Sequence, residues 1–416
     1  SACVECHMPS KTYMVVDPRR DHSIRVPRPD LTLKIGTPNA CQPCHTDKPP
    51  EWAAEKVVEW YGPKRAQDPH YGEIIAAGRA ANPAAESALI DLAKHKRLLD
   101  KAHSVGGIVR ATAVSLLGRY GSSASREALE RALRDDDPLV RTAAIRQVDQ
   151  DRQVDERASE RLRRLLVPLL DDKVRLVRTE AARTLTVVPM REFTKAERAR
   201  FDVVLAEWRA GLQETIDDAG AHLAYGLVDA NLGQTSQARE EYLTAIRLHP
   251  TPIQAVQARV QLAMLEHEQG HNAEAEKLYR EVIEQEPKWE QGFFSLGLLL
   301  AEDANRLTEA TEALGKAAEL APTNARMQYN YGLALQRLGK PADAEKCLLA
   351  ADKLAPDTFD FMNALAILFA QQRKWDQALR YAERLARIDP RMESLVGEIR
   401  EQAKQPRTFG PATGKQ

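Results

Sequence analysis

The sequence has no long apolar run, no excess of charge of one sign and few cysteines. Its longest apolar stretches, such as residues 297–301, are far too short to cross a bilayer, so no membrane span is predicted. Lys and Arg (59) nearly balance Asp and Glu (60), and this net charge of −1 gives no reason to expect a nucleic-acid or membrane-surface partner. Four of the five cysteines lie near the start, which leaves Cys347 alone and no pair for a disulfide.

Those four cysteines form two copies of the pattern Cys-x-x-Cys-His, at residues 3–7 and 41–45. This spacing is the attachment site of a c-type haem, in which two thiols bond to the porphyrin and the histidine ligates the iron. The alternative is one zinc ion bound by all four cysteines, which would leave both histidines without a role. We therefore predict two haems c, with these attachment residues and proximal ligands: Cys3, Cys6, Cys41 and Cys44, and His7 and His45.

Residues 1–65 form the predicted dihaem segment. They are rich in Pro, His and Cys, and they show helical periodicity only at 51–61, after two prolines. So short a segment could hardly bury a core of its own, and two porphyrins would supply the missing apolar mass. We expect an apolar stripe of the helix to pack on the second haem or on the next helix: Trp52, Ala53, Val57, Trp60 and Tyr61.

Residues 66–200 show pairs of helices with a loose internal repeat. The similar triplets 108–110, 139–141 and 176–178 each open a helix, and the second and third follow acidic turns that suit a helix start. The arginines that end the triplets are 31 and then 37 residues apart. The pattern resembles HEAT repeats, which have about 40 residues per helix pair. The alternative is an irregular helical linker domain.

Residues 201–404 contain the clearest repeat. Prolines at 250, 287, 322, 356 and 390 are spaced by 37, 35, 34 and 34 residues, with an alanine twelve residues before each. A further Gly or Ala marks the preceding helix of each unit. The pattern resembles the tetratricopeptide repeat, in which two antiparallel helices cross at small residues and a proline ends the second. We predict an all-α chain with about five such repeats, a capping helix to about 404 and a flexible tail at 405–416.

The first helices of a tetratricopeptide array line a concave groove, and such grooves commonly hold a peptide or helix of a partner protein. We therefore expect a docked protein partner; the alternative is that the array acts only as a spacer. With the phase set by the prolines, the groove would be lined in the fourth and fifth units by Tyr329, Gln336, Arg337, Asn363 and Gln371.

A wider resemblance surrounds the haem motifs. The stretch from Cys3 to Pro9, the pair Asp21-His22 and the second motif resemble the last two haem sites of pentahaem cytochrome c nitrite reductases. Residues 13–22 and 25–30 are similar to multihaem cytochromes c in which tetratricopeptide repeats follow this segment. The resemblance implies that His22 ligates the iron of a haem bound further upstream. It also implies a second ligand for the first haem from a downstream helix: by order this is His70, with His95 and His103 as alternatives.

Four arginines flank His22 in the sequence. Guanidinium forks match carboxylates, and haem propionates are carboxylates that are often partly buried. The alternative is a solvated basic loop. The candidates for propionate pairing are Arg19, Arg20, Arg25 and Arg28.

Together these features predict an exported multihaem c-type cytochrome, periplasmic or extracellular, that transfers electrons and docks a redox partner through its solenoid. One alternative is a haem enzyme with an open iron face that reduces a small nitrogen or oxygen species, although no catalytic residue is identified. Another is a scaffold in which haems act as structural staples. Because a haem motif begins at Cys3, we also expect a missing upstream segment with further haems.

Overall fold

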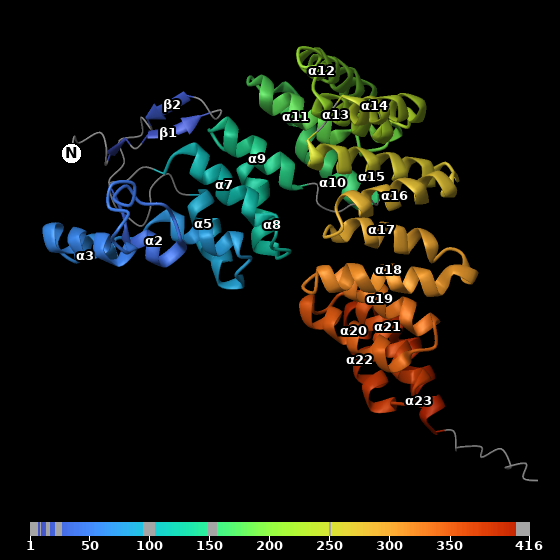
Figure 1. Cartoon of the computed structure of the whole chain (residues 1–416). Helices are drawn as coiled ribbons and strands as arrows, with labels where there is room; N and C mark the ends of the chain where they lie inside the picture. The colour runs from blue at the N-terminus through green and yellow to red at the C-terminus, as the bar shows by residue number, and fades with distance from the viewer. Residues whose placement is uncertain are drawn as a thin grey trace, which may run out of the picture. The chain divides into compact units, whose positions relative to one another are not determined.

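The computed structural model describes residues 7–8, 10–13, 17–20, 27–94, 105–148, 156–248 and 251–404. The chain divides into two compact units, residues 1–214 and 215–416, which are described separately. The predicted helical solenoid is confirmed, and none of the described helices is long and apolar enough to span a membrane (Figure 1). The boundaries expected after residues 65 and 200 fall inside α4 (Lys64–Gln67) and α12 (Lys195–Gln213), and the expected tail at 405–416 lies outside the described residues.

The first unit begins with short elements. Strands β1 (Ser10–Tyr13) and β2 (Asp17–Arg20) pair antiparallel, with Ser10 opposite Arg20. Helix α2 (Asp30–Ile35) ends at Gly36, whose φ of 70° is left-handed and suits glycine. Helix α3 (Pro50–Tyr61) confirms the helix predicted at 51–61 and adds Pro50 in its first turn. The hairpin and α2 were not predicted, because elements of four to six residues are too short to show a period.

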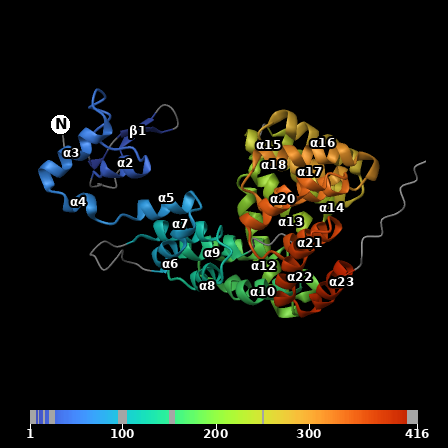
Figure 2. The ribbon, with the colours of Figure 1, turned by 90° about the horizontal axis from the view of Figure 1, so that it is seen from below.

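The rest of the first unit is built from pairs of helices that pack together in both views of the ribbon (Figures 1 and 2). The three predicted triplets open α7, α9 and α11, which confirms the repeat. The helices are α5 (Tyr71–Arg79), α6 (Glu86–Lys94), α7 (Gly107–Leu117), α8 (Ser123–Ala132), α9 (Pro138–Val148), α10 (Glu156–Leu166), α11 (Arg175–Leu185) and α12, with 3₁₀ turns at Pro83–Ala85, Val167–Asp171 and Met190–Glu192.

The repeated arginines connect one helix pair to the next. Arg141 on α9 donates to both carboxylate oxygens of Asp172, which precedes α11, over 2.9 and 3.0 Å. The arginines at the equivalent positions also reach forward along the chain: Arg110, which is buried, bonds Asp135, and Arg178 bonds Glu207. The ion pairs of Arg141 and Arg178 are bidentate, which makes them strong and directional, so they fix the position of the chain segment that follows each arginine.

The second unit is an array of antiparallel helix pairs. Its first helices are α13 (Ala219–Asn231), α15 (Pro252–Glu268), α17 (Glu290–Leu300), α19 (Ala325–Arg337) and α21 (Phe359–Gln371). Its second helices are α14 (Thr235–Arg247), α16 (Asn272–Gln285), α18 (Leu307–Leu320), α20 (Pro341–Leu354) and α22 (Trp375–Ile388). The predicted capping helix is α23 (Glu393–Lys404), and 3₁₀ turns lie at Ala304–Arg306 and Pro390–Met392.

Small residues lie where the two helices of each unit cross. The five predicted alanines of the second helices are fully buried: Ala238, Ala275, Ala310, Ala344 and Ala378. On the first helices, a methyl group added at Gly332 would lie 2.8 Å from Leu348 Cγ, and one added at Gly297 would lie 2.7 Å from Leu314 Cγ. At these two positions the helices therefore approach so closely that only glycine fits without a shift of its neighbours. The second helices end two residues before Pro287, Pro322, Pro356 and Pro390, as predicted.

Candidate functional site

The second Cys-x-x-Cys-His motif forms a single helical turn. The carbonyl oxygen of Cys41 accepts hydrogen bonds from the backbone N–H of Cys44 (3.2 Å) and of His45 (3.0 Å). Cys44 and His45 are exposed and Cys41 is half-buried. Of the first motif, Cys3 and Cys6 lie outside the described residues, whereas His7 is described and half-buried. The geometry can therefore be followed in full only at the second motif.

Asn39, which was not among the predicted site residues, caps this turn. Its Oδ1 accepts from the backbone N–H of Cys41 (3.0 Å) and of Gln42 (3.2 Å), and its Nδ2 donates to Thr32 Oγ1 on α2 (3.1 Å). Two N–H groups that a helical turn would leave without a partner are thus satisfied by one side chain. The sequence signal was an asparagine, a preferred N-cap, two residues before Cys41.

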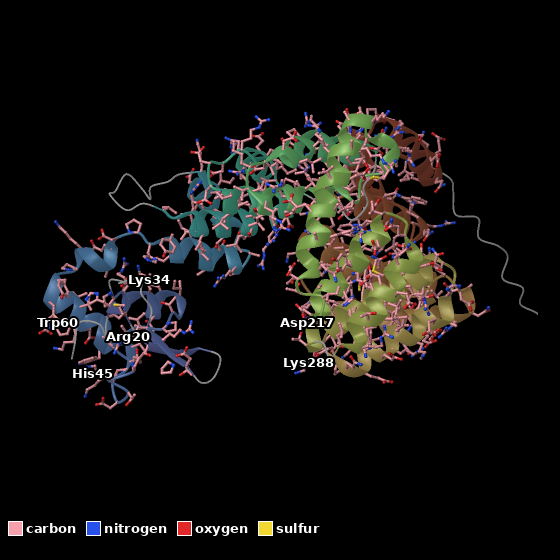
Figure 3. All side chains as sticks on the ribbon, turned by 90° about the horizontal axis from the view of Figure 1, so that it is seen from above. Arg20, Lys34, His45, Trp60, Asp217 and Lys288 are labelled. Atoms are coloured by element: carbon pink, nitrogen blue, oxygen red, sulfur yellow. The ribbon has the colours of Figure 1, made fainter. Side chains whose placement is uncertain are left out.

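Aromatic side chains follow the motif on α3. The ring of Trp52 lies 4.6 Å from that of His45, centroid to centroid. Further along, Ala53 is buried, but Trp60 and Tyr61 are 63% and 65% exposed. The stripe that was expected to pack is thus only partly covered by the described chain. Figure 3 shows His45 and Trp60 on the same N-terminal part of the molecule, together with Arg20 and Lys34.

The residues at the second motif fit a haem c. An exposed thiol at Cys44, a second thiol one turn earlier and the imidazole of His45 are the groups that hold such a haem. The uncovered rings of α3 match the apolar faces of a porphyrin. When bound there, the group would supply a redox-active iron with His45 on one face. In the part of the chain that the structure describes, no three His, Cys, Asp or Glu side chains cluster to hold a metal ion by themselves.

His70 caps a helix in this structure, and its role as an iron ligand stays a prediction. It is the N-cap residue of α5, where its Nδ1 accepts a hydrogen bond from the backbone N–H of Gly72 (3.0 Å) and its ring stacks on Tyr71. The geometry thus gives His70 a capping function. His22, His95 and His103 lie outside the described residues.

Arg28 is bonded within the chain. Its Nε and Nη2 each donate to a carboxylate oxygen of Asp30 over 2.8 Å, and Nη2 also donates to the carbonyl oxygen of Asp68 (3.1 Å). Burial opposes ionisation of Asp30, but the hydrogen bond from Arg28 and the positive charges of Arg28 and Lys34 together outweigh it and lower the pKa of that carboxyl. Lys34 adds bonds to the carbonyl of Ala66 and to Glu73, both at 3.3 Å. The planar fork of Arg28 therefore holds α2 against the chain before α5.

The other predicted propionate partners lie on β2 or outside the described residues. Arg19 forms an exposed ion pair with Asp17 (2.7 Å), and Arg20 Nη1 donates to the carbonyl oxygen of Met8 (3.3 Å). Arg25 is not described. Because exposed ion pairs contribute little, Arg19 could exchange Asp17 for another carboxylate at small cost.

The predicted groove residues lie on exposed parts of α19 and α21. Tyr329 is half-buried with its ring 4.8 Å from that of Phe361, and burial raises the pKa of its hydroxyl. Gln336 Nε2 donates to Gln371 Oε1 (2.7 Å), which connects the first helices of two units. Arg337 is exposed and Asn363 is half-buried. These residues thus occupy adjoining positions on successive first helices.

An apolar residue follows the small crossing residue in every unit. Three of these side chains are large and well exposed: Met264 (38%), Leu298 (40%) and Ile367 (40%). Leu333 and Ile367 lie four residues from Tyr329 and Asn363, so they share a helix face with them. This face of the first helices, the first-helix stripe, was predicted only through its polar members. The missed apolar members are Leu227, Met264, Leu298, Leu333 and Ile367.

A separate surface hollow of about 530 Å³ lies between α18 and α19. It is lined in part by Thr311, Lys316, Gln328 and Tyr331, and none of the predicted residues contributes to it.

Comparison with known proteins identifies the repeats. A family model of HEAT repeats matches residues 96–186, and the tetratricopeptide repeat model matches residues 223–288, 296–353 and 329–393. The chain carries both kinds of repeat. The matched tetratricopeptide segments coincide with the helix pairs of the second unit, so that unit is a repeat array of a type suited to binding proteins.

Similar proteins share the repeats. Human Protein O-mannosyl-transferase TMTC3 is 32% identical over 142 residues, which are 31% of this chain and 15% of that protein. A TPR repeat-containing protein of Pseudomonas aeruginosa is 28% identical over 181 residues, which are 41% of this chain and 30% of that protein. The matches thus span less than a third of either relative.

Two solved structures are similar to part of the chain. YrrB, described as a TPR protein with an unusual peptide-binding site, is 17% identical with a TM-score of 0.38, over 46% of this chain and 96% of its own. PilF of Pseudomonas aeruginosa is 22% identical with a TM-score of 0.38, over 46% of this chain and 89% of its own.

Proposed function

We propose that the protein is an exported multihaem c-type cytochrome that transfers electrons and docks a partner protein through its tetratricopeptide array. The observation that carries the proposal is the turn at residues 41–45, which presents two thiols and an imidazole in the order that a haem c requires. The first motif, with His7 as its proximal ligand, would hold the second haem. Because haem c is attached after export, the proposal places the protein in the periplasm or outside the cell.

The decisive experiment counts haems. The full chain is produced in a host that matures c-type cytochromes, and haem per chain is measured for the wild type and for Cys41→Ala with Cys44→Ala. We expect two haems in the wild type and one in the double variant. Cys347→Ala, which removes a cysteine outside both motifs, should leave the count unchanged. A wild type that carries zinc or no haem would refute the proposal.

The docking part of the proposal rests on the first-helix stripe. Its exposed aliphatic side chains share a helix face with amides and with the exposed cation Arg337, so it suits a partner segment that brings apolar side chains. The amides of Gln336 and Gln371 can both donate to and accept from the backbone of such a segment.

A binding comparison tests this second part. Once a partner from the same compartment is identified, its Kd for the full chain is measured for the wild type and for Tyr329→Ala with Arg337→Glu. We expect at least tenfold weaker binding by the double variant. Lys353→Glu, an equal charge reversal on the second helix α20, should bind like the wild type. Equal binding by all three proteins would place the docking site elsewhere.

A further inference from the structure

The side chain of Asn39 accepts hydrogen bonds in the manner of a helix N-cap, although the turn that follows it is only one turn long. Its side-chain oxygen accepts from the N–H groups two and three residues ahead, those of Cys41 and Gln42. The next hydrogen bonds of the turn are accepted by the carbonyl oxygen of Cys41, from the backbone N–H groups of Cys44 and His45. A single helical turn is unstable by itself, because nucleation fixes several residues for one hydrogen bond. An external cap is therefore a large part of what keeps this turn formed.

The amide of Asn39 also fixes where the turn lies. Its Nδ2 donates to Thr32 Oγ1 on α2 (3.1 Å) and to the side-chain oxygen of Gln42, whose own Nε2 donates to the carbonyl of Lys48 (3.2 Å). Helix α2 is tied in turn to the chain before α5 through Arg28 and Lys34. One half-buried side chain thus connects the conformation of the motif to the rest of the unit.

We infer that Asn39 is a positioning residue for haem attachment: it preorganises Cys41, Cys44 and His45 before the thioether bonds form. This inference rests on the proposed function. In that reaction Cys41 and Cys44 each add S–H across a vinyl group of the porphyrin. Sulfur bonds to the carbon next to the ring, hydrogen goes to the terminal carbon, and nothing leaves, so reduced thiols suffice and no oxidant is needed. The addition needs both thiols and the imidazole on one side at the same time, which the capped turn provides.

The test measures the rate of haem attachment. Reduced apoprotein of the full chain is mixed with ferrous iron protoporphyrin IX, and the fraction of the 41–45 peptide that carries haem is followed by mass spectrometry. Loss of an N-cap lowers the population of a helical turn by a factor of about five. We therefore expect Asn39→Ala to attach haem about fivefold more slowly. Asn39→Asp keeps the accepting oxygen and should restore most of the rate. Thr32→Val keeps the cap but removes the anchor, and should have an intermediate effect.

The matched control is Asn82→Ala. Asn82 caps the 3₁₀ turn Pro83–Ala85 in the same unit and is far from both motifs in sequence, so it should not change the rate. A loss of rate that comes only from weakened folding would slow Asn39→Ala and Asn82→Ala alike, and a cap without a role in attachment would leave Asn39→Ala as fast as the wild type; either result would overturn the inference. If Asn39→Ala does not fold, the comparison of Thr32→Val with the wild type decides. A wild type that attaches no haem at all refutes the proposed function itself, whereas attachment at equal rates refutes only the role of Asn39.

Discussion

The N-terminal helices and the tetratricopeptide array achieve order in different ways. Among the described side chains of residues 27–79, only Pro29, Leu31, Ala53 and Gly78 are buried. The array buries small and large apolar residues in every unit, from Ala219 to Ile399. Hydrogen bonds and ion pairs from Asn39, Arg28 and Lys34 hold the N-terminal part instead.

The difference shows how far the stability of each part depends on a bound group. Burial of apolar surface is the main stabilising contribution in folding, and the array obtains it from its own sequence. The N-terminal part has little such burial and exposes Trp60 and Tyr61, so a bound porphyrin would change it far more than it would change the array.

The largest expected effect follows from haem removal. We predict that chain produced without haem maturation exchanges the backbone amides of residues 27–79 on the order of a hundredfold faster than haem-loaded chain. The amides of residues 251–404 should exchange at the same rate in both. Hydrogen exchange followed by mass spectrometry measures both segments at once. Equal protection of residues 27–79 in the two preparations would remove the contrast between the parts.

A second prediction concerns the close crossing of helices in the array. Gly332→Ala places a methyl group 2.8 Å from Leu348 Cγ and should lower the free energy of unfolding by about 2 kcal/mol. Gly397→Ala in α23 is the control, because a methyl group there meets nothing within 4 Å. It should stabilise the chain by about 0.7 kcal/mol through helix propensity. Thermal and denaturant unfolding measure both; a stabilising Gly332→Ala would contradict the crossing geometry.

The array should also lose stability in acid. Hydrogen bonds from Arg306, and then from Arg280, lower the pKa of Glu276 from 4.5 to about 2. A carboxylate with a depressed pKa stabilises the fold fully above its unfolded pKa, and this contribution is lost as the pH falls from about 4.5 towards 2. Glu276→Gln should therefore reduce the slope of unfolding temperature against pH in this window. The exposed Glu240→Gln should leave the slope unchanged, and equal slopes for all three proteins would count against the ion-pair network.

The smallest effect is expected at a turn. The first-to-second helix turns of three units place a glycine in the left-handed region, at Gly233, Gly270 and Gly339, whereas the fifth unit has Arg373 at a φ of 59°. Arg373→Gly relieves this strain but adds flexibility to the unfolded chain, so we expect a gain of roughly 0.5 kcal/mol. Gly339→Ala is the reverse change and should cost about 1 kcal/mol. Denaturant midpoints resolve the difference in sign, and a loss on Arg373→Gly would show that the arginine is favoured there.

Periodic features were predictable from the sequence and the contacts of individual side chains were not. Helix α3 was predicted from apolar residues that recur about every 3 residues along it. The triplet repeat and the crossing alanines were predicted from spacings of up to 37 residues between one repeat and the next. The capping role of His70 and the pairing of Arg28 with Asp30 depend on which neighbour lies within 3 Å, which no period encodes. The apolar members of the first-helix stripe were missed because exposure of an aliphatic side chain depends on the packing of adjacent helices. The haem ligands and attachment residues remain predictions.

The ion pairs of the forward-reaching arginines affect the order in which the repeats of the first unit can fold during synthesis. Arg110 and Arg141 find their carboxylates in the turns before α9 and α11, and Arg178 finds its carboxylate on α12. During synthesis the N-terminal part of the chain emerges from the ribosome first. Each of these arginines therefore emerges before its carboxylate partner, which follows about 30 residues later. Before the partner has emerged, burial of Arg110 would leave its positive charge unpaired, and this disfavours packing of the core around it. The carboxylate partner of each of these arginines therefore belongs to a part of the chain that is synthesised after the arginine itself.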